Sequence, residues 1–135
     1  MSLKQLQDVM AQFEQADCPV THHFTDGMYA RELFIPEGVA LVGAKHKTNH
    51  MYVMLEGECV ITTDGNDPFT CEAGFIGHTK AGTKKAFYAI KDSRFVSFHV
   101  TEETDVESIG NEILYEEQNV FPIWKKMCLE DKSCG

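Results

Sequence analysis

The sequence predicts an all-β sandwich or barrel for residues 20–101. Roughly eight short runs rich in β-branched and aromatic residues follow one another there at about ten-residue spacing. Turn residues separate the runs, as at Pro36-Glu37-Gly38 and Asp64-Gly65-Asn66. No helical pattern interrupts them, which argues against a parallel α/β sheet. The expected strands cover residues 29–35, 39–45, 51–55, 59–63, 69–72, 74–79, 84–90 and 95–100.

The first segment, residues 1–19, is expected to be an N-terminal helix. From Ser2 to Ala16, apolar side chains recur at intervals of three and four residues, and Ser2 is placed as a possible cap. Asp17-Cys18-Pro19 ends the pattern. The apolar stripe should pack on the barrel or on a second subunit; it comprises Leu3, Leu6, Val9, Met10 and Phe13.

The last segment, residues 102–135, is expected to be a helical extension with a loose tail. Thr104-Asp105-Val106-Glu107 resembles a capping box, which marks the start of a helix. A second short helix is expected at Phe121–Leu129, because Pro122 is tolerated in a first helical turn. Glu130–Gly135 reads as the tail.

The formal charge of the 135-residue chain is -9. An acidic surface repels phosphate backbones and anionic lipid, so neither nucleic acid nor a membrane is an expected partner. The five cysteines are odd in number and contain no C-x-x-C pair, which favours free thiols in a reducing compartment. No apolar run is long enough to span a bilayer and the N-terminus does not resemble a secretory signal, so we expect a cytoplasmic protein.

Two histidines four residues apart are the first candidates for chemistry. His46 and His50 lie in "GVALVGAKHKTNHMYVMLEGE", between Gly38 and Gly57. A second stretch, "GFIGHTKAGTKK", places Gly74 and Gly82 at a similar rhythm. Together these stretches resemble the two sequence motifs of cupins, and three further segments resemble small cupins of phages and prophages. Those segments are "YARELFIPEGVALVGAKHK", "AGTKKAFYA" and "FHVTEETDVE".

The resemblance implies a double-stranded β-helix (jelly-roll) barrel, often dimeric, whose interior pocket often holds a divalent metal. In the first motif His46 falls on the second histidine and His50 on the glutamate, whereas Ala44 stands where the first histidine is expected. In the second motif Lys85 replaces the histidine and Lys80 the proline. The glycine framework therefore matches well, and the usual ligand set does not.

A third metal ligand must come from elsewhere, because a lysine ammonium has no lone pair to donate. If residues 84–90 and 95–100 form a hairpin with a three-residue loop, His99 lies opposite Lys85 and reaches the same interior position. A two-residue loop would instead pair Phe98 with Lys85 and turn His99 away. The candidate metal site is His46, His50 and His99, with His78 in reserve, for Zn, Fe, Ni or Mn.

The pocket around these histidines is expected to include Lys85, His78, Tyr52 and Phe87. A lysine beside a histidine cluster favours an anionic small-molecule ligand such as a carboxylate, and it weakens the binding of a dication. An alternative is that Lys84 and Lys85 form a solvated strand end. His22 and His23 are adjacent, so at most one of them points inward, and neither is assigned to the site.

Three functions remain open from the sequence. The first is a metal-dependent enzyme of the oxygenase or isomerase type. The second is a binding module for a small polar molecule, which the incomplete ligand set favours. The third is a non-catalytic phage or bacterial accessory protein that acts through the surface of a homodimer. The N-terminal helix and the apolar segment "NVFPIWKKM" would supply that surface, with Trp124 and Phe121 as anchors.

Overall fold

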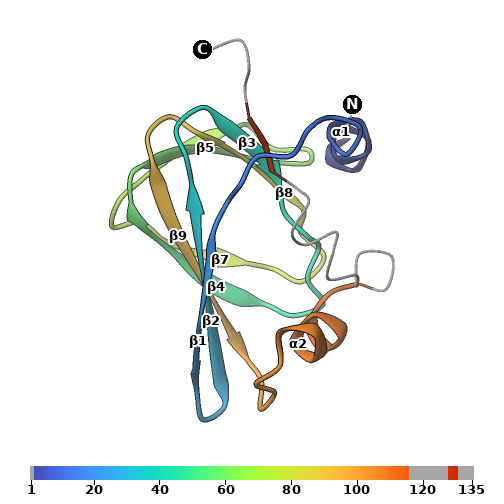
Figure 1. The fold of residues 1–135 in the computed structure, drawn as a ribbon, viewed down its shortest axis with the longest axis vertical. Coiled ribbons are helices and arrows are strands. Elements are labelled where there is room, and N and C mark those ends of the chain that lie inside the picture. The colour runs from blue at the N-terminus through green and yellow to red at the C-terminus, as the bar shows by residue number, and fades with distance from the viewer. Residues whose placement is uncertain (1, 116–127, 131–135) are drawn as a thin grey trace.

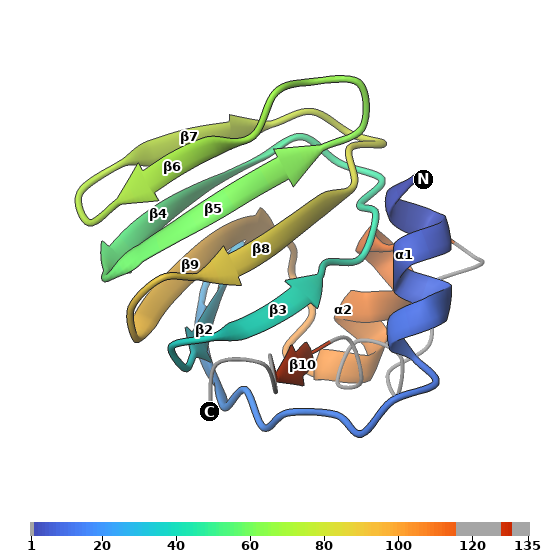
Figure 2. The same ribbon diagram turned by 90° about the horizontal axis from the view of Figure 1, so that it is seen from above.

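Two five-stranded sheets face each other in the computed structural model, which describes residues 2–115 and 128–130 (Figures 1 and 2). The first sheet has the strand order β1-β2-β9-β4-β7 and the second β10-β3-β8-β5-β6, with antiparallel neighbours throughout. The protein is therefore mostly β and has the jelly-roll architecture that the sequence predicted. The strands are β1 (Val20–Thr25), β2 (Met28–Ile35), β3 (Val39–Val42), β4 (His50–Glu56), β5 (Glu58–Thr63), β6 (Phe69–Glu72), β7 (Ile76–Thr79), β8 (Lys85–Ala89), β9 (Ser93–Val100) and β10 (Cys128–Glu130).

Two of these strands were not expected from the sequence. β1 forms a hairpin with β2, and Gly27 takes the positive φ of 76° that its tight turn requires. β10 pairs with the edge of β3, so that Cys128 lies opposite Leu41. The helix predicted for residues 121–129 is therefore wrong at Cys128 and Leu129, because these residues extend a sheet. Residues 121–127 of that helix lie outside the described residues.

The predicted hairpin between residues 84–90 and 95–100 does not form. β8 pairs with β3 and β5 in the second sheet, whereas β9 pairs with β2 and β4 in the first. The chain crosses from one sheet to the other between these strands, as Figure 2 shows. His99 consequently lies opposite Tyr29 of β2 and is not paired with Lys85.

Both described helices are short and lie at one side of the barrel (Figure 2). α1 (Leu3–Met10) begins at a capping box made by Ser2 and Gln5, and it ends well before Ala16, where the sequence placed its end. Its side chains Leu3 and Met10 pack on Val42. α2 (Val106–Ile113) is capped one residue later than predicted, because the Asp105 carboxylate accepts a hydrogen bond from the Ser108 N–H.

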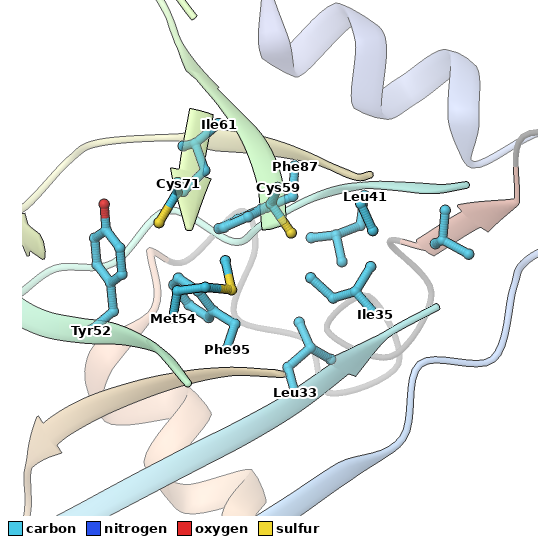
Figure 3. Packing of buried hydrophobic residues seen from close by; sticks show 12 residues of the cluster. Leu33, Ile35, Leu41, Tyr52, Met54, Cys59, Ile61, Cys71, Phe87 and Phe95 are labelled. Atoms are coloured by element: carbon cyan, nitrogen blue, oxygen red, sulfur yellow. The ribbon is translucent and has the colours of Figure 1, made fainter. Parts of the chain in front are cut away.

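The main hydrophobic core fills one end of the space between the sheets. In Figure 3 Leu33, Met54 and Phe95 face Leu41 and Cys59 across this space. Cys18, Cys59 and Cys71 are free thiols. Neither helix in the described part of the chain has the length and apolar character needed to cross a bilayer.

Candidate functional site

The inner face of the first sheet changes from polar to apolar along its strands. At one end, Tyr29 of β2 lies opposite His99 of β9. His50 of β4 lies opposite Thr79 of β7. Because alternate residues of a strand face the same side, the next inward positions lie two residues further along each strand: Arg31, Ser97, Tyr52 and Gly77. The positions beyond these belong to the apolar core: Leu33, Phe95 and Met54.

The structure brings the three predicted histidines together at the polar end. The ring centroids of His46 and His50 are 4.5 Å apart, those of His50 and His99 4.8 Å, and those of His46 and His99 5.0 Å. We call His46, His50 and His99 the histidine cluster. His50 and His99 come from strands β4 and β9, and His46 from the loop between β3 and β4.

All three rings of the histidine cluster are held in the neutral form. Burial, followed by the charges of His99 and His50, lowers the pKa of His46 well below its usual value. Burial lowers the pKa of His99 to about 3, and it also lowers that of His50, where a hydrogen bond to the Thr48 carbonyl acts in the opposite direction. Neutral imidazole has a nitrogen lone pair, so each ring can accept a proton or bind a metal ion.

His99 has a buried ring nitrogen without a hydrogen-bond partner. Its side chain is buried, Nε2 lies 3.0 Å from the Ser97 hydroxyl oxygen, and Nδ1 has no hydrogen-bond partner. A buried nitrogen without a partner is unfavourable, and such groups in native proteins call for an explanation. If Nε2–H donates to Ser97, the lone pair lies on Nδ1, which is how an outer residue orients a metal-binding histidine.

The loop that carries His46 is braced from two sides. Its backbone forms a bridge with Leu114, just after α2, and the Lys47 N–H donates to the Ile113 carbonyl at 2.6 Å. On the other side the Gly82 N–H donates to the His46 carbonyl at 2.8 Å. The C-terminal extension therefore helps to position His46, a role that the sequence alone did not reveal.

Ala44 occupies the position where the cupin motif has its first histidine, and the structure shows no room for one. Ala44 is 5% exposed and packs in a cluster with Tyr29, Ile109 and Leu114. An imidazole at residue 44 would have to displace α2. The histidine missing from this motif position is thus replaced by apolar packing.

Two adjacent lysines at the start of β8, Lys84 just before the strand and Lys85 as its first residue, have different environments. Lys84 is buried near α1, where its ammonium donates to the Gly43 carbonyl at 3.1 Å. Lys85 points to the barrel interior, where its Nζ lies 3.8 Å from the centre of the Tyr52 ring and donates to the Thr79 hydroxyl. Burial lowers the pKa of both lysines to about 8. Neither is therefore part of a solvated strand end.

A glycine makes room for the ring beneath Lys85. Gly77 of β7 lies opposite Tyr52, and a Cβ placed on Gly77 would overlap the Tyr52 ring. Tyr52 is buried and also packs against the tilted ring of Phe95 at a centroid distance of 4.8 Å. The ring that supports the Lys85 ammonium is thus fixed by packing on both sides.

A cavity of about 480 Å³ adjoins these residues. His46, His50 and Lys85 line it, and so does Phe87. His99 lies in contact range of the two lining histidines, but it is not itself a lining residue. The volume lies in the range of small-molecule sites in proteins. We call four of the lining side chains the apolar floor of the cavity: Leu33, Leu41, Phe87 and Phe95.

Two residues predicted to line the pocket do not do so. His78 lies opposite Met51 with its side chain exposed, because its neighbours Gly77 and Thr79 take the inward positions of β7. It is neither a lining residue nor a reserve ligand for the histidine cluster. Tyr52 is buried beneath Lys85 and supports the cavity without lining it.

The sequence did not assign several side chains that the structure places at the cavity. His22 of the unexpected strand β1 lines it, and its Nδ1 lies 2.7 Å from the Tyr29 hydroxyl. Arg31 and Ser97 line it as well. The alternation of β2 and β9 could have identified Arg31 and Ser97, since both share a face with core residues of the same strand. Nothing in the sequence marked residues 20–25 as a strand.

The donor types of the histidine cluster suit a transition metal, whereas the present ring orientations do not. Imidazole binds Zn, Fe or Ni well, and the unpartnered Nδ1 of His99 is available. The rings of His46 and His99 are within 5° of parallel, however, so their lone pairs do not converge on one point. In the described part of the chain, no three His, Cys, Asp or Glu side chains are arranged to hold a metal ion as they stand. The rings of the histidine cluster would have to rotate before they could bind one metal ion together.

Comparison with known proteins identifies the fold. Ectoine synthase from P. lautus superposes with a TM-score of 0.61 at 16% identity, over 85% of this chain and 86% of that one. An RmlC-like cupin from Methanocaldococcus jannaschii gives 0.53 at 14% identity, over 67% and 87%. A DMSP lyase from Ruegeria pomeroyi gives 0.57 at 14% identity, over 67% of this chain and 50% of the lyase, so the chain spans about half the length of that enzyme.

No protein-family profile and no curated protein sequence matches the chain. At these low identities the structural likenesses establish the fold alone. The fold is the double-stranded β-helix of the cupin structure from Methanocaldococcus jannaschii, which confirms the fold that the resemblance implied.

Proposed function

We propose that this cupin-fold protein binds a small polar ligand in its interior cavity, and that the histidine cluster holds a divalent metal ion beside that ligand. One observation carries the proposal. Three neutral imidazoles from three separate segments lie with their ring centroids within 5.0 Å of one another, and one of them has a buried nitrogen without a partner.

A metal bound by three protein ligands keeps open positions for water or a ligand, and it polarises oxygen atoms bound there. The protein's own residues would orient the metal-binding histidines and select the ligand. Ser97 would orient the ring of His99 by accepting a hydrogen bond from Nε2–H, and the brace between Leu114 and His46 would hold the loop. The Lys85 ammonium opposes a dication by repulsion and attracts anions, so it favours a metal site that also holds an anionic ligand.

Elemental analysis of untagged protein purified with divalent ions present tests the metal. We expect about one ion per chain, with affinity for Zn, Fe, Ni or Mn set by the imidazole donors. His99→Ala and His46→Ala should each reduce the metal content to background. His78→Ala is the matched control, because this exposed histidine lies outside the cluster, and it should retain the wild-type content. Substoichiometric metal in the wild-type protein, or full retention in both cluster variants, would refute the metal site.

A second candidate function, as an accessory protein that acts through a homodimer, is favoured by the outer face of the first sheet. Antiparallel sheets that face water normally carry polar side chains on that side. Here five large apolar side chains from β2, β4, β7 and β9 are exposed: Met28 43%, Met51 45%, Leu55 52%, Ile76 59% and Val100 80%. A second copy of the chain would cover them by packing the same face against itself.

The sequence suggested a dimer interface at the N-terminal helix and the segment "NVFPIWKKM". The interface proposed here is instead the outer face of the first sheet. Sedimentation of the wild-type protein should show a dimer at micromolar concentration. Ile76→Glu should shift it to a monomer, whereas Phe13→Glu, on an exposed apolar residue beyond α1, should leave the dimer intact. A wild-type monomer over the whole concentration range would refute this candidate.

A further inference from the structure

We infer that the ligand of this cavity is a small organic carboxylate, whose carboxylate group binds the Lys85 ammonium and whose apolar part lies on the apolar floor. The inference rests on the proposed function only for the use of the cavity as a binding site. It does not require the metal ion.

Lys85 is a cation with unused donors. An ammonium has three N–H donors, and that of Lys85 makes one hydrogen bond, to Thr79, besides its contact with the Tyr52 ring. No carboxylate among the described residues lies within ion-pair distance of Lys85. A half-buried ammonium without a counter-charge is costly, and an anion bound in the cavity would remove that cost.

The charges around the cavity also favour an anion. Arg31 and Lys85 line it, and both act on His46 as positive charges. Among the described residues that line the cavity, Asp17 is the one acidic residue, and it is exposed to solvent. His46 and His50 also line the cavity, where their ring nitrogens can form hydrogen bonds to a ligand.

The apolar floor favours an organic body over an inorganic ion. Its four side chains close the inner end of the cavity, next to the main core. A phosphate or sulfate ion would leave this surface facing empty or water-filled space and would gain nothing from it. A carboxylate with a short aliphatic or aromatic body can place one end at Lys85 and bury the other, at roughly 25 cal/mol for each Å² of apolar surface.

Calorimetric titration of the full chain tests the inference. The probes are butyrate, 4-methylpentanoate and benzoate, the amides of the same three acids, and inorganic phosphate. We expect saturable binding of at least one carboxylate, about tenfold or more tighter than its own amide, because a charge-assisted hydrogen bond is roughly twice as strong as a neutral one. Absence of carboxylate binding, equal affinity for the amide, or tighter binding of phosphate would overturn the inference.

The adjacent lysines provide a matched pair of variants. Lys85→Met should weaken carboxylate binding about tenfold or more, to the level of the amide. Lys84→Met removes the same charge from the residue just before β8, which does not line the cavity, and should leave binding unchanged. Lys85→Gln is a second variant that keeps a polar group beside Thr79 in case the methionine variant does not fold. Undiminished binding by a folded Lys85 variant would overturn the inference.

The failure of this inference can be told apart from failure of the metal proposal. Titrations in EDTA measure the carboxylate site alone, and there His99→Ala should bind the carboxylate as the wild type does. Lys85→Met should in turn retain its metal ion. Carboxylate binding in EDTA without any metal uptake would support the inference and remove the metal ion. Metal uptake without carboxylate binding would support the metal site and overturn the carboxylate inference.

Discussion

Lys84→Met should stabilise the protein at neutral pH. The Lys84 side chain is 5% exposed, and its pKa falls from the usual 10.5 to about 8, chiefly because of burial and then because of the nearby charges of Lys4 and Lys45. The unfolded chain therefore binds a proton more tightly than the folded one, which costs about 3 kcal/mol of stability at pH 7. The lost hydrogen bond to Gly43 offsets about 1–2 kcal/mol of this, so we expect a net gain of about 1–2 kcal/mol.

The stability gained by Lys84→Met should depend on pH. The folded-state pKa of Lys84 is depressed, so the unfolded state binds more protons between about pH 8 and 10.5 and the charge penalty disappears as the pH rises through that window. Lys85 acts in the same direction, and the raised pKa of the Cys71 thiol, about 11, acts in the opposite one. Both proteins contain Lys85 and Cys71, so these contributions cancel when the free energy of unfolding of the wild type is subtracted from that of the variant.

Urea unfolding of both proteins at pH 7, 8, 9 and 10 measures this difference. The advantage of Lys84→Met should shrink by about 2 kcal/mol from pH 7 to pH 10, and its sign should reverse near the upper end. A pH-independent difference would refute the reasoning, since it would mean that Lys84 keeps an ordinary pKa in the folded protein. A destabilised variant at pH 7 would show that the bond to Gly43 outweighs the burial of charge.

Three further predictions concern packing around the site. Gly77→Ala should destabilise the protein by about 1–3 kcal/mol in urea unfolding, because its methyl group overlaps the Tyr52 ring; an unchanged midpoint would mean that this ring has free space. Gly57→Ala should cost more than Gly77→Ala, since Gly57 has a φ of 87° and a Cβ there meets the Asp92 backbone; equal or smaller loss would contradict the steric argument. Leu114→Ala should cost about 2–5 kcal/mol and speed amide exchange at Gly82, whose N–H bonds to the loop of His46; unaltered exchange would show that Leu114 does not brace that loop.

The strand pattern of residues 28–100 could be predicted because turn glycines and alternating apolar residues are local signals. β6 begins and ends at the predicted residues, and β5 differs by one. β1 was missed because residues 20–25 carry two adjacent histidines and threonines in place of an apolar alternation. β10 was missed because pairing with the edge of β3 depends on a segment far away in the sequence.

The convergence of His46, His50 and His99 was predicted with the wrong strand pairing. The prediction treated β8 and β9 as a hairpin, whereas the chain crosses between sheets there. His99 still faces the interior, because it lies four residues from Phe95 on the same strand, and residues an even number apart share a face. The reserve role of His78 failed by the same rule, because its neighbours Gly77 and Thr79 face inward.

The amino-acid sequence by itself determined the β-strand rhythm, the cupin glycine framework and the side-chain types available for chemistry, because these depend on neighbours along the chain. Tertiary structure alone decided that Lys84 is buried, where the helix at Ile113 braces the loop of His46, and that His22 reaches the cavity. The physical reason is that burial, and with it the charge state of each group, depends on which sheet covers which face. That arrangement depends on contacts between residues far apart in the chain.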